Sequence, residues 1–194
     1  MKAAMTTSDR ILGEARNLIM ARGYNGFSYA DIAAVIGVSK ANVHHHFAGK
    51  SDLATAVVEQ SRSGIQAQVR SLEDSDLDAA EQLRAYARYW ERCIFDNSAP
   101  FCIGAMLAAE LPSLPDDVAT AVRAFFAELS GWLTKILVLG LRQGNVTLVG
   151  TPEEEADAFL SAVYGAMLSA RAFGDPRRFT VIVETLLSRV VPFR

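Results

Sequence analysis

Residues 27–53, FSYADIAAVIGVSKANVHHHFAGKSDL, decide the fold of this chain. They contain two short helical patterns separated by Gly37, and a serine precedes each pattern. Ser28 is a typical N-cap with Asp31 three residues further on, and Ser39 is placed to cap the second helix. Gly37 suits the left-handed backbone with which helices commonly end. The stretch is therefore predicted to form a helix, a tight turn and a second helix.

The second helix, Lys40–His46, is too short to be stable through its own propensity. Val43 and Phe47 give it two apolar anchors, four residues apart. A short helix with a polar outer face suits the major groove of DNA, where each base pair presents a distinct pattern of donors and acceptors. A solvated surface helix is the alternative. The polar outer face consists of Lys40, Asn42, His44, His45 and His46.

The run from Ile11 to Leu53 resembles the DNA-binding domain of the tetracycline-repressor (TetR) family of bacterial transcription regulators. The resemblance rests on a first helix ending in ARGY at residues 21–24, on the helix-turn-helix, and on Phe47, Lys50 and Leu53. It implies a repressor that binds double-stranded DNA, and the expected contacts are Ser28, Tyr29, Lys40, Asn42, His44, His45 and Lys50.

The predicted recognition helix departs from the family's usual residues. The family often has a small residue followed by Thr, Leu, Tyr and Tyr, where this chain has Ala41, Asn42, Val43, His44 and His45. In the family, tyrosine hydroxyls usually contact phosphate at these positions. The sequence therefore leaves open which groups make those contacts here.

Composition and charge fit a compact protein with one basic end. The 194 residues are 51% hydrophobic, enough for a substantial core in one or two compact units. Residues 1–62 carry seven Lys/Arg and five Asp/Glu, while the remainder carries 12 and 17. Positive charge thus coincides with the predicted helix-turn-helix, and contact with nucleic acid is expected to be local and salt-dependent.

No membrane segment, disulfide framework, metal site or cofactor is predicted. The longest apolar-rich run, Ile136–Leu141, is too short to span a bilayer, and no signal-peptide pattern is recognised, so a cytoplasmic protein is expected. Cys93 and Cys102 are too few for a disulfide framework. The histidines at 44–46 point about 100° apart on a helix and do not chelate one ion.

Helical patterns alone account for the chain. Ser8 is expected to cap the first helix, which ends at Gly23, and Lys50 to about Leu72 is expected to be one continuous helix. The further helices are expected at Leu77–Phe95, Phe101–Leu111, Pro115–Arg142, Pro152–Phe173 and Arg177–Val190. The prediction is an all-α protein of about nine helices, with a DNA-binding domain at residues 1–49 and an effector-binding and dimerisation domain at residues 50–194. The expected core of the first domain is Ile11, Leu18, Ile19, Phe27, Ile32, Ile36, Val43 and Phe47.

The last two helices combine small residues with large apolar ones. The resemblance implies that they pair with their copies in a second subunit, and ordinary packing within one chain is the alternative. A homodimer also has a physical motive, because one short recognition helix offers few contacts. Two of them on a two-fold axis read a palindromic operator with half-sites roughly 34 Å apart, or a multiple of that.

Aromatic and sulfur-containing residues in the central helices are candidates for lining an effector site. Tyrosine and tryptophan each need a polar partner when buried, and an apolar cavity with a few polar groups is the usual small-molecule site. Ordinary core packing is the alternative for each of them. Glu110, in an otherwise apolar stretch, is expected to be exposed. The candidates are Tyr86, Tyr89, Trp90, Cys93, Phe101, Cys102, Met106, Phe125, Leu129, Trp132, Tyr164 and Met167.

Cys102 is the sharpest of these candidates. It is expected at the start of the short helix after Pro100, where free backbone N–H groups favour a thiolate. Residues 101–118, FCIGAMLAAELPSLPDDV, also resemble a branch of the family in which some members respond to electrophiles through a cysteine there. A small buried thiol is the structural alternative. The resulting hypothesis is a repressor released from DNA by a small-molecule or electrophilic effector, and a ligand-processing or stress-response enzyme using Cys102 is the alternative from another class.

Overall fold

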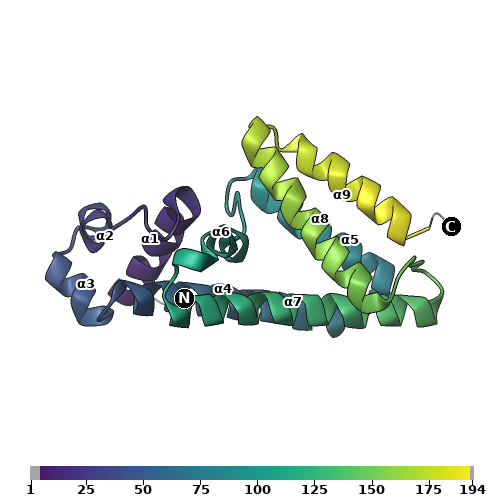
Figure 1. Ribbon diagram of the computed structural model, residues 1–194, viewed down its shortest axis with the longest axis horizontal. Helices are drawn as coiled ribbons and strands as arrows, with labels where there is room; N and C mark the ends of the chain where they lie inside the picture. The colour runs from purple at the N-terminus through teal and green to yellow at the C-terminus, as the bar shows by residue number, and fades with distance from the viewer. Residues whose placement is uncertain (1–4, 193–194) are drawn as a thin grey trace. The chain divides into compact units, whose positions relative to one another are not determined.

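The computed structural model describes residues 5–192, and within that range the chain forms nine α-helices, one 3-10 turn and no strand (Figure 1). The all-α prediction and the number of helices are confirmed. The helices are α1 (Thr7–Arg22), α2 (Tyr29–Ile36), α3 (Lys40–His46), α4 (Lys50–Glu73), α5 (Ala79–Phe95), α6 (Ile103–Ala109), α7 (Asp116–Gln143), α8 (Pro152–Phe173) and α9 (Arg177–Val190), with the 3-10 turn η1 at Leu111–Ser113.

Local capping explains where most of the helices begin. Asp78 and Glu81 exchange hydrogen bonds with each other's backbone N–H at the start of α5, and Thr151 and Glu154 do the same at α8. The prediction that Ser8 caps α1 is wrong. Thr6 is the cap, because it has Asp9 three residues further on: the Asp9 N–H donates to Thr6 Oγ1 at 3.1 Å, and the Thr6 N–H donates to Asp9 Oδ2 at 2.9 Å.

The helices form two compact units. Unit 1 comprises the chain up to Ile65 together with Ile103–Phe125, and unit 2 comprises Gln66–Cys102 together with the chain from Phe126 onward. Helices α4 and α7 contribute to both units, and the chain passes from unit 2 to unit 1 between Cys102 and Ile103. The predicted boundary between residues 49 and 50 separates two functions, DNA binding and effector binding, and not two compact units. It stays a prediction.

The core of unit 1 is mostly the predicted one. Ile11, Leu18, Ile19, Phe27, Ile32 and Val43 are buried, whereas Ile36 and Phe47 are only half-buried. Those two residues lie at the ends of α2 and α3, next to surface turns, where fewer neighbours cover them. Leu53, Ala54, Val57 and Val58 of α4 complete the core, so the three short helices are packed against a fourth.

Helices α8 and α9 lie side by side in unit 2, and α5 packs against α9 (Figure 1). The interior contains Phe159, Val163 and Met167 from α8 and Phe179 and Val183 from α9, all at most 3% exposed. Burial of these large side chains is the main source of stability for the pair.

Helix α7 is, among the described residues, the one helix long and apolar enough to cross a membrane by length and composition. The apolar run Ile136–Leu141 lies within this longer helix, and the absence of a membrane segment stays a prediction. Most of the largest apolar side chains of this helix are packed inside the protein, since Val118, Val122, Leu133, Ile136 and Leu137 are at most 3% exposed, although Leu141 is 46% exposed. Core packing thus accounts for the apolar character of α7.

Candidate DNA-binding surface and effector site

The geometry of α2 and α3 is that of a helix-turn-helix. Gly37 ends α2 with φ 72° and ψ 39°, a left-handed conformation that glycine adopts without steric cost. Ser39 then caps α3, and its Oγ accepts from the Asn42 N–H at 3.1 Å. At the start of α2, the Ser28 N–H and hydroxyl both donate to Asp31 Oδ2, at 2.7 and 2.6 Å. The predicted helix, turn and helix are confirmed.

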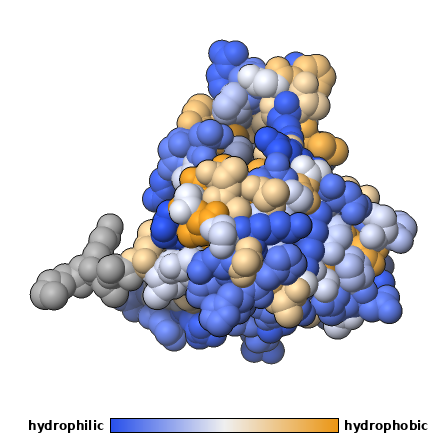
Figure 2. Space-filling view, turned by 90° about the vertical axis from the view of Figure 1, so that its left-hand side faces the viewer, coloured by the Kyte–Doolittle hydropathy of each residue, from blue (hydrophilic) through white to orange (hydrophobic). Residues whose placement is uncertain are grey.

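Helix α3 presents a polar face to solvent. Lys40, His44 and His45, all predicted DNA contacts, are exposed, and His46 is exposed beside them. The face of the protein drawn in Figure 2 is mainly hydrophilic, with some hydrophobic residues between the hydrophilic ones. Asn42 is half-buried, and its Oδ1 has no hydrogen-bond partner among the described residues. The exposed cationic and imidazole groups are therefore the ones that can reach DNA without rearrangement.

Tyr29, which is predicted to contact the DNA backbone, is engaged inside unit 1. It is 5% exposed, its hydroxyl donates to the Phe47 carbonyl at 3.1 Å, and its ring lies 4.5 Å from the His44 ring. Burial, assisted by the charge of Asp52, raises the pKa of Tyr29 to about 12, so the hydroxyl stays a donor. Tyr29 thus holds the end of α3 and supports His44.

Lys50, also predicted to bind the DNA backbone, has an internal role as well. Its ammonium donates to the Phe27 carbonyl at 2.5 Å and lies over the rings of Tyr24 and Phe27, 4.8 and 4.4 Å from their centroids. Burial lowers the pKa of Lys50, while the carboxylates of Glu110 and Asp31 act in the opposite direction. The lysine therefore ties the start of α4 to the segment before α2.

Glu110, expected to be exposed, is half-buried and hydrogen-bonded. Its Oε2 accepts from the Tyr24 N–H at 2.9 Å. The carboxylate fills the space beside Gly23, where a Cβ would lie 1.6 Å from Oε1. One residue after α6, Glu110 thus attaches that helix to the loop following α1. The expectation failed because helical periodicity does not reveal a partner 86 residues away.

Several predicted effector residues come together in unit 2. The rings of Tyr86 on α5 and Trp132 on α7 lie 5.4 Å apart. The Cys102 thiol lies 3.8 Å from the Tyr164 hydroxyl of α8, to which it donates a weak hydrogen bond. Burial raises the pKa of both tyrosines, and the nearby Cys102 adds to the rise. We define the aromatic cluster as Tyr86, Trp90, Cys102, Trp132 and Tyr164.

The other predicted effector residues are placed around this cluster or apart from it. Cys93, Phe101, Leu129 and Met167 are buried in unit 2, and Tyr89 is half-buried, with its ring against that of Trp90. Met106 and Phe125 belong to unit 1, where Phe125 packs so close to Gly104 that a Cβ there would be 2.6 Å from the ring.

Cys102 lies before α6 and not within it. The helix begins at Ile103 and has seven residues, so the predicted start at Phe101 is wrong, and the argument from a helix terminus carries little weight. The thiol is 1% exposed. Any reagent must therefore enter the protein interior to reach it, and the thiol contacts the Tyr164 hydroxyl there.

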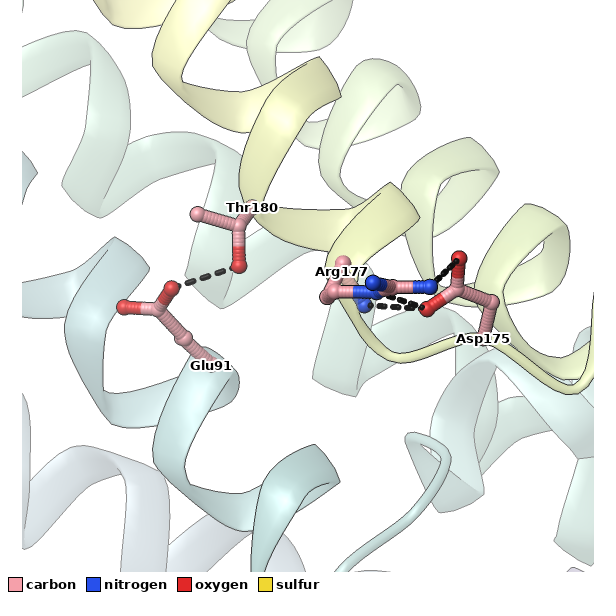
Figure 3. A network of polar contacts seen from close by, with 4 residues as sticks. All are labelled: Glu91, Asp175, Arg177 and Thr180. Carbon is pink, nitrogen blue, oxygen red and sulfur yellow. Dashed lines mark hydrogen bonds and ion pairs between the residues drawn. The ribbon is translucent and has the colours of Figure 1, made fainter.

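A separate groove of about 450 Å³ runs between α5 and α9. None of the predicted effector residues lines it. In its lining, the Thr180 hydroxyl donates to Glu91 Oε1 at 2.5 Å, and the ion pair of Arg177 with Asp175 lies nearby (Figure 3). The groove shares no residue with the aromatic cluster, in which the Tyr86 hydroxyl and the indole Nε1 atoms of Trp90 and Trp132 have no hydrogen-bond partner among the described residues.

No group of three or more His, Cys, Asp or Glu side chains suited to a metal ion occurs among residues 5–192.

Sequence reasoning missed two further contacts of unit 1, besides those of Tyr29 and Lys50. One is the Glu110 bond to Tyr24, and the other is a hydrogen bond from the Arg10 guanidinium to the Ile36 carbonyl, which attaches α1 to the end of α2. The lone acidic residue in the apolar stretch at 105–111 was the available signal for the first.

Comparison with known proteins finds similarity to bacterial transcription regulators in both sequence and structure. The model of the family "Bacterial regulatory proteins, tetR family" matches residues 11–57. The crystal structure of a TetR-family transcriptional regulator from Agrobacterium tumefaciens is 49% identical and covers 95% of this chain and 97% of that one, with a TM-score of 0.93. A TetR transcriptional regulator from Legionella pneumophila is 27% identical over 98% and 100%, with a TM-score of 0.88. The HTH-type transcriptional repressor NemR of Escherichia coli K12 is 20% identical over 85% of this chain and 84% of NemR.

Proposed function

Because this chain belongs to the TetR family of bacterial transcription regulators, we propose that it is a homodimeric repressor whose operator affinity falls when an effector binds in unit 2. The observation that carries the proposal is a helix-turn-helix whose second helix exposes Lys40, His44 and His45. The relatives are named as transcriptional regulators, which favours this function over the enzyme alternative. The expected location is the cytoplasm, where DNA is accessible.

The contacts with DNA divide into direct and supporting residues. We propose that Lys40, His44 and His45 contact bases or phosphates in the major groove, with Asn42 and Ser28 at its edge. Tyr29 and Lys50, which are held inside unit 1, support the recognition helix and do not contact phosphate directly. Loss of a direct contact then lowers DNA affinity without lowering stability, and loss of a supporting contact lowers both.

Dimerisation is proposed through α8 and α9. Leu168 and Phe173 on α8 and Val181 on α9 are 58%, 64% and 63% exposed, although they are large and apolar. Large apolar residues gathered on an exposed helix pair mark an interaction surface. A two-fold pairing of these helices presents two recognition helices to a palindromic operator.

Signal transmission is proposed to pass along the chain through α6. Cys102 of the aromatic cluster is followed at once by α6, and Glu110 just after α6 binds the backbone of Tyr24. An effector that shifts α6 thereby acts on the end of α1, and a tilt of α4 changes the separation of the two recognition helices. The effector achieves this only as far as it binds the two arrangements with different free energies.

The effector is either a reversible ligand or an electrophile that reacts with Cys102. In the second case, the thiol sulfur adds to the β-carbon of a conjugated carbonyl compound, and the thiol proton ends on the α-carbon. Exchange of Cys102 for serine separates the two cases, because it removes the nucleophile and keeps the size of the side chain.

Selection from a random duplex library tests the DNA-binding role. The full-length protein should enrich a palindrome, and Lys40→Met should weaken its binding to that palindrome, with a smaller dependence of affinity on salt. Recovery of no common sequence, together with equal binding to all duplexes, would show that the chain is not a sequence-specific regulator.

A further inference from the structure

Three hydrogen-bond donors of the aromatic cluster lack an acceptor. The Tyr86 hydroxyl and the indole Nε1 atoms of Trp90 and Trp132 are buried, and none has a partner among the described residues. The three side chains are 6%, 4% and 4% exposed. Buried donors in folded proteins are nearly always paired, because an unpaired donor has lost its hydration without compensation.

The three donors come from neighbouring side chains. Trp90 follows Tyr86 by one turn of α5, and the Trp132 ring lies 5.4 Å from the Tyr86 ring. The Trp90 indole N–H lies close enough to the Tyr86 oxygen to oppose the rise in the pKa of that hydroxyl, although the pair does not reach hydrogen-bond geometry. The three side chains therefore lie in one region of unit 2, to which Cys102 and Tyr164 also belong.

The region offers donors but no buried positive charge. Among the described residues, the buried polar or charged side chains are Gln82 and Asn145, and neither is a cation. Arg171 stands over the Phe101 ring at 5.3 Å, but it is exposed to solvent. A carboxylate brought among these donors would lose its hydration without a compensating cation, whereas a neutral oxygen would lose far less.

We propose that the aromatic cluster binds an uncharged aromatic ketone. The carbonyl oxygen accepts hydrogen bonds from the Tyr86 hydroxyl and an indole N–H, since one carbonyl oxygen has two acceptor positions, and the ring of the ligand lies among the aromatic side chains. This inference rests on the proposed function and names the chemical class of its effector. It requires no reaction at Cys102.

Three probes of one shape test the chemical class. Isothermal titration calorimetry of the full-length protein compares 2-acetylnaphthalene, 2-ethylnaphthalene and 2-naphthoate, which carry a carbonyl, no acceptor and a carboxylate on the same ring system. The protein is held in the syringe because the probes dissolve sparingly. The ketone should bind at least tenfold more tightly than either of the others. Binding of the carboxylate or the hydrocarbon as tightly as the ketone would overturn the proposal.

Tyr86→Phe tests the residue assignment. This variant should bind the ketone about tenfold more weakly and the hydrocarbon unchanged, as expected for loss of one hydrogen bond. Tyr24→Phe, a buried tyrosine of unit 1, is the matched control and should bind both probes as the wild type does. Should Tyr86→Phe fail to fold, Trp132→Phe replaces it. If the folded variant still prefers the ketone over the hydrocarbon as strongly as the wild type does, the assignment is contradicted.

Operator binding is measured in parallel to separate two failures. If the ketone is not preferred while specific DNA binding persists, the ligand class is wrong and the repressor function stands. If specific DNA binding is absent, the proposed function fails whichever probe binds.

Discussion

The carboxylate of Glu110 accepts a hydrogen bond from the backbone N–H of Tyr24 at 2.9 Å, and the two residues are 86 positions apart in the sequence. The bond connects the segment after α6 with the loop after α1 inside unit 1. Burial lowers the pKa of Lys50, and the same carboxylate acts in the opposite direction. The Lys50 ammonium donates to the Phe27 carbonyl. Glu110 therefore links the segment after α6 to the loop after α1, and we propose that a movement of α6 reaches the helix-turn-helix through this residue.

Replacement of Glu110 by alanine should uncouple effector binding from DNA release. The Tyr24 N–H loses its acceptor, so the free energy of unfolding should fall by about 1–2 kcal/mol. In the wild type, the effector lowers operator affinity by some factor. In the variant, that factor should be at least tenfold smaller. Fluorescence anisotropy with labelled operator measures both affinities. Glu184→Ala, which removes an exposed carboxylate on α9, is the control.

Gly23→Ala should destabilise the protein more than Gly144→Ala. Both glycines have positive φ, 76° and 69°, so each substitution carries backbone strain of about 1–3 kcal/mol. A Cβ at Gly23 also meets the Glu110 carboxylate at 1.6 Å, whereas Gly144 has nothing within 4 Å. Urea denaturation of the two variants measures the difference. In a Glu110→Ala background, the excess cost of Gly23→Ala should largely disappear, and equal costs in the wild-type background would disprove the close contact.

Lys40→Met and Lys50→Met should separate a direct contact from a supporting one. The exposed Lys40 has no internal role assigned to it, so its variant should retain stability, bind the operator more weakly and lose about one unit of salt slope. Lys50→Met should lose about 1–2 kcal/mol of stability along with its bond to the Phe27 carbonyl, with the salt slope unchanged. Thermal denaturation and anisotropy at several salt concentrations distinguish the two. An unchanged stability of Lys50→Met would contradict the internal role.

Stability should fall as the pH rises above 10, partly because of Tyr29. The folded protein raises the pKa of this residue from 10 to about 12, so its contribution is complete below pH 10 and is lost as the pH rises toward 12. Denaturation at pH 8, 9.5 and 11 measures the fall. Tyr29→Phe should show a smaller fall, and a fall of equal size in this variant would exclude Tyr29 as a source.

Tyr86→Phe should leave the protein as stable as the wild type or more stable. Its hydroxyl is buried without a partner, so its removal relieves a desolvation cost of up to about 1 kcal/mol. Tyr29→Phe, by contrast, removes a hydroxyl that donates to the Phe47 carbonyl and should lose about 1 kcal/mol at pH 7. Thermal melts of the two variants provide the comparison. A clear loss of stability in Tyr86→Phe would indicate that its hydroxyl is paired.

The helices were predictable because their ends are determined locally. Helix ends depend on residues close in the sequence, such as Gly37 after α2 and the capping pair Asp78 and Glu81 at α5. A short sequence motif is enough to predict such ends. The assignment of Ser8 as a cap failed at the same level, because two candidates lay two residues apart and only the reciprocal bonds of Thr6 decided between them.

The roles of single side chains were harder to predict. Lys50 and Tyr29 belong to types that contact phosphate when exposed, but tertiary packing directs them to carbonyls 23 and 18 residues away. Glu110 depends on a partner still more distant in the sequence. Such pairings arise from the arrangement of helices, which periodicity alone does not specify. The contacts of Lys40, His44 and His45 with DNA and the lining of the effector site stay predictions.

Fluorescence anisotropy with the selected operator tests the central claim most directly. The full-length protein is titrated into labelled operator and into a scrambled duplex at two salt concentrations. The titration is then repeated with N-ethylmaleimide and with 2-acetylnaphthalene, for the wild type and Cys102→Ser. The account predicts tight binding to the operator alone and weaker binding in the presence of at least one of the two compounds. Equal binding to both duplexes, or operator binding that neither compound changes, would contradict it.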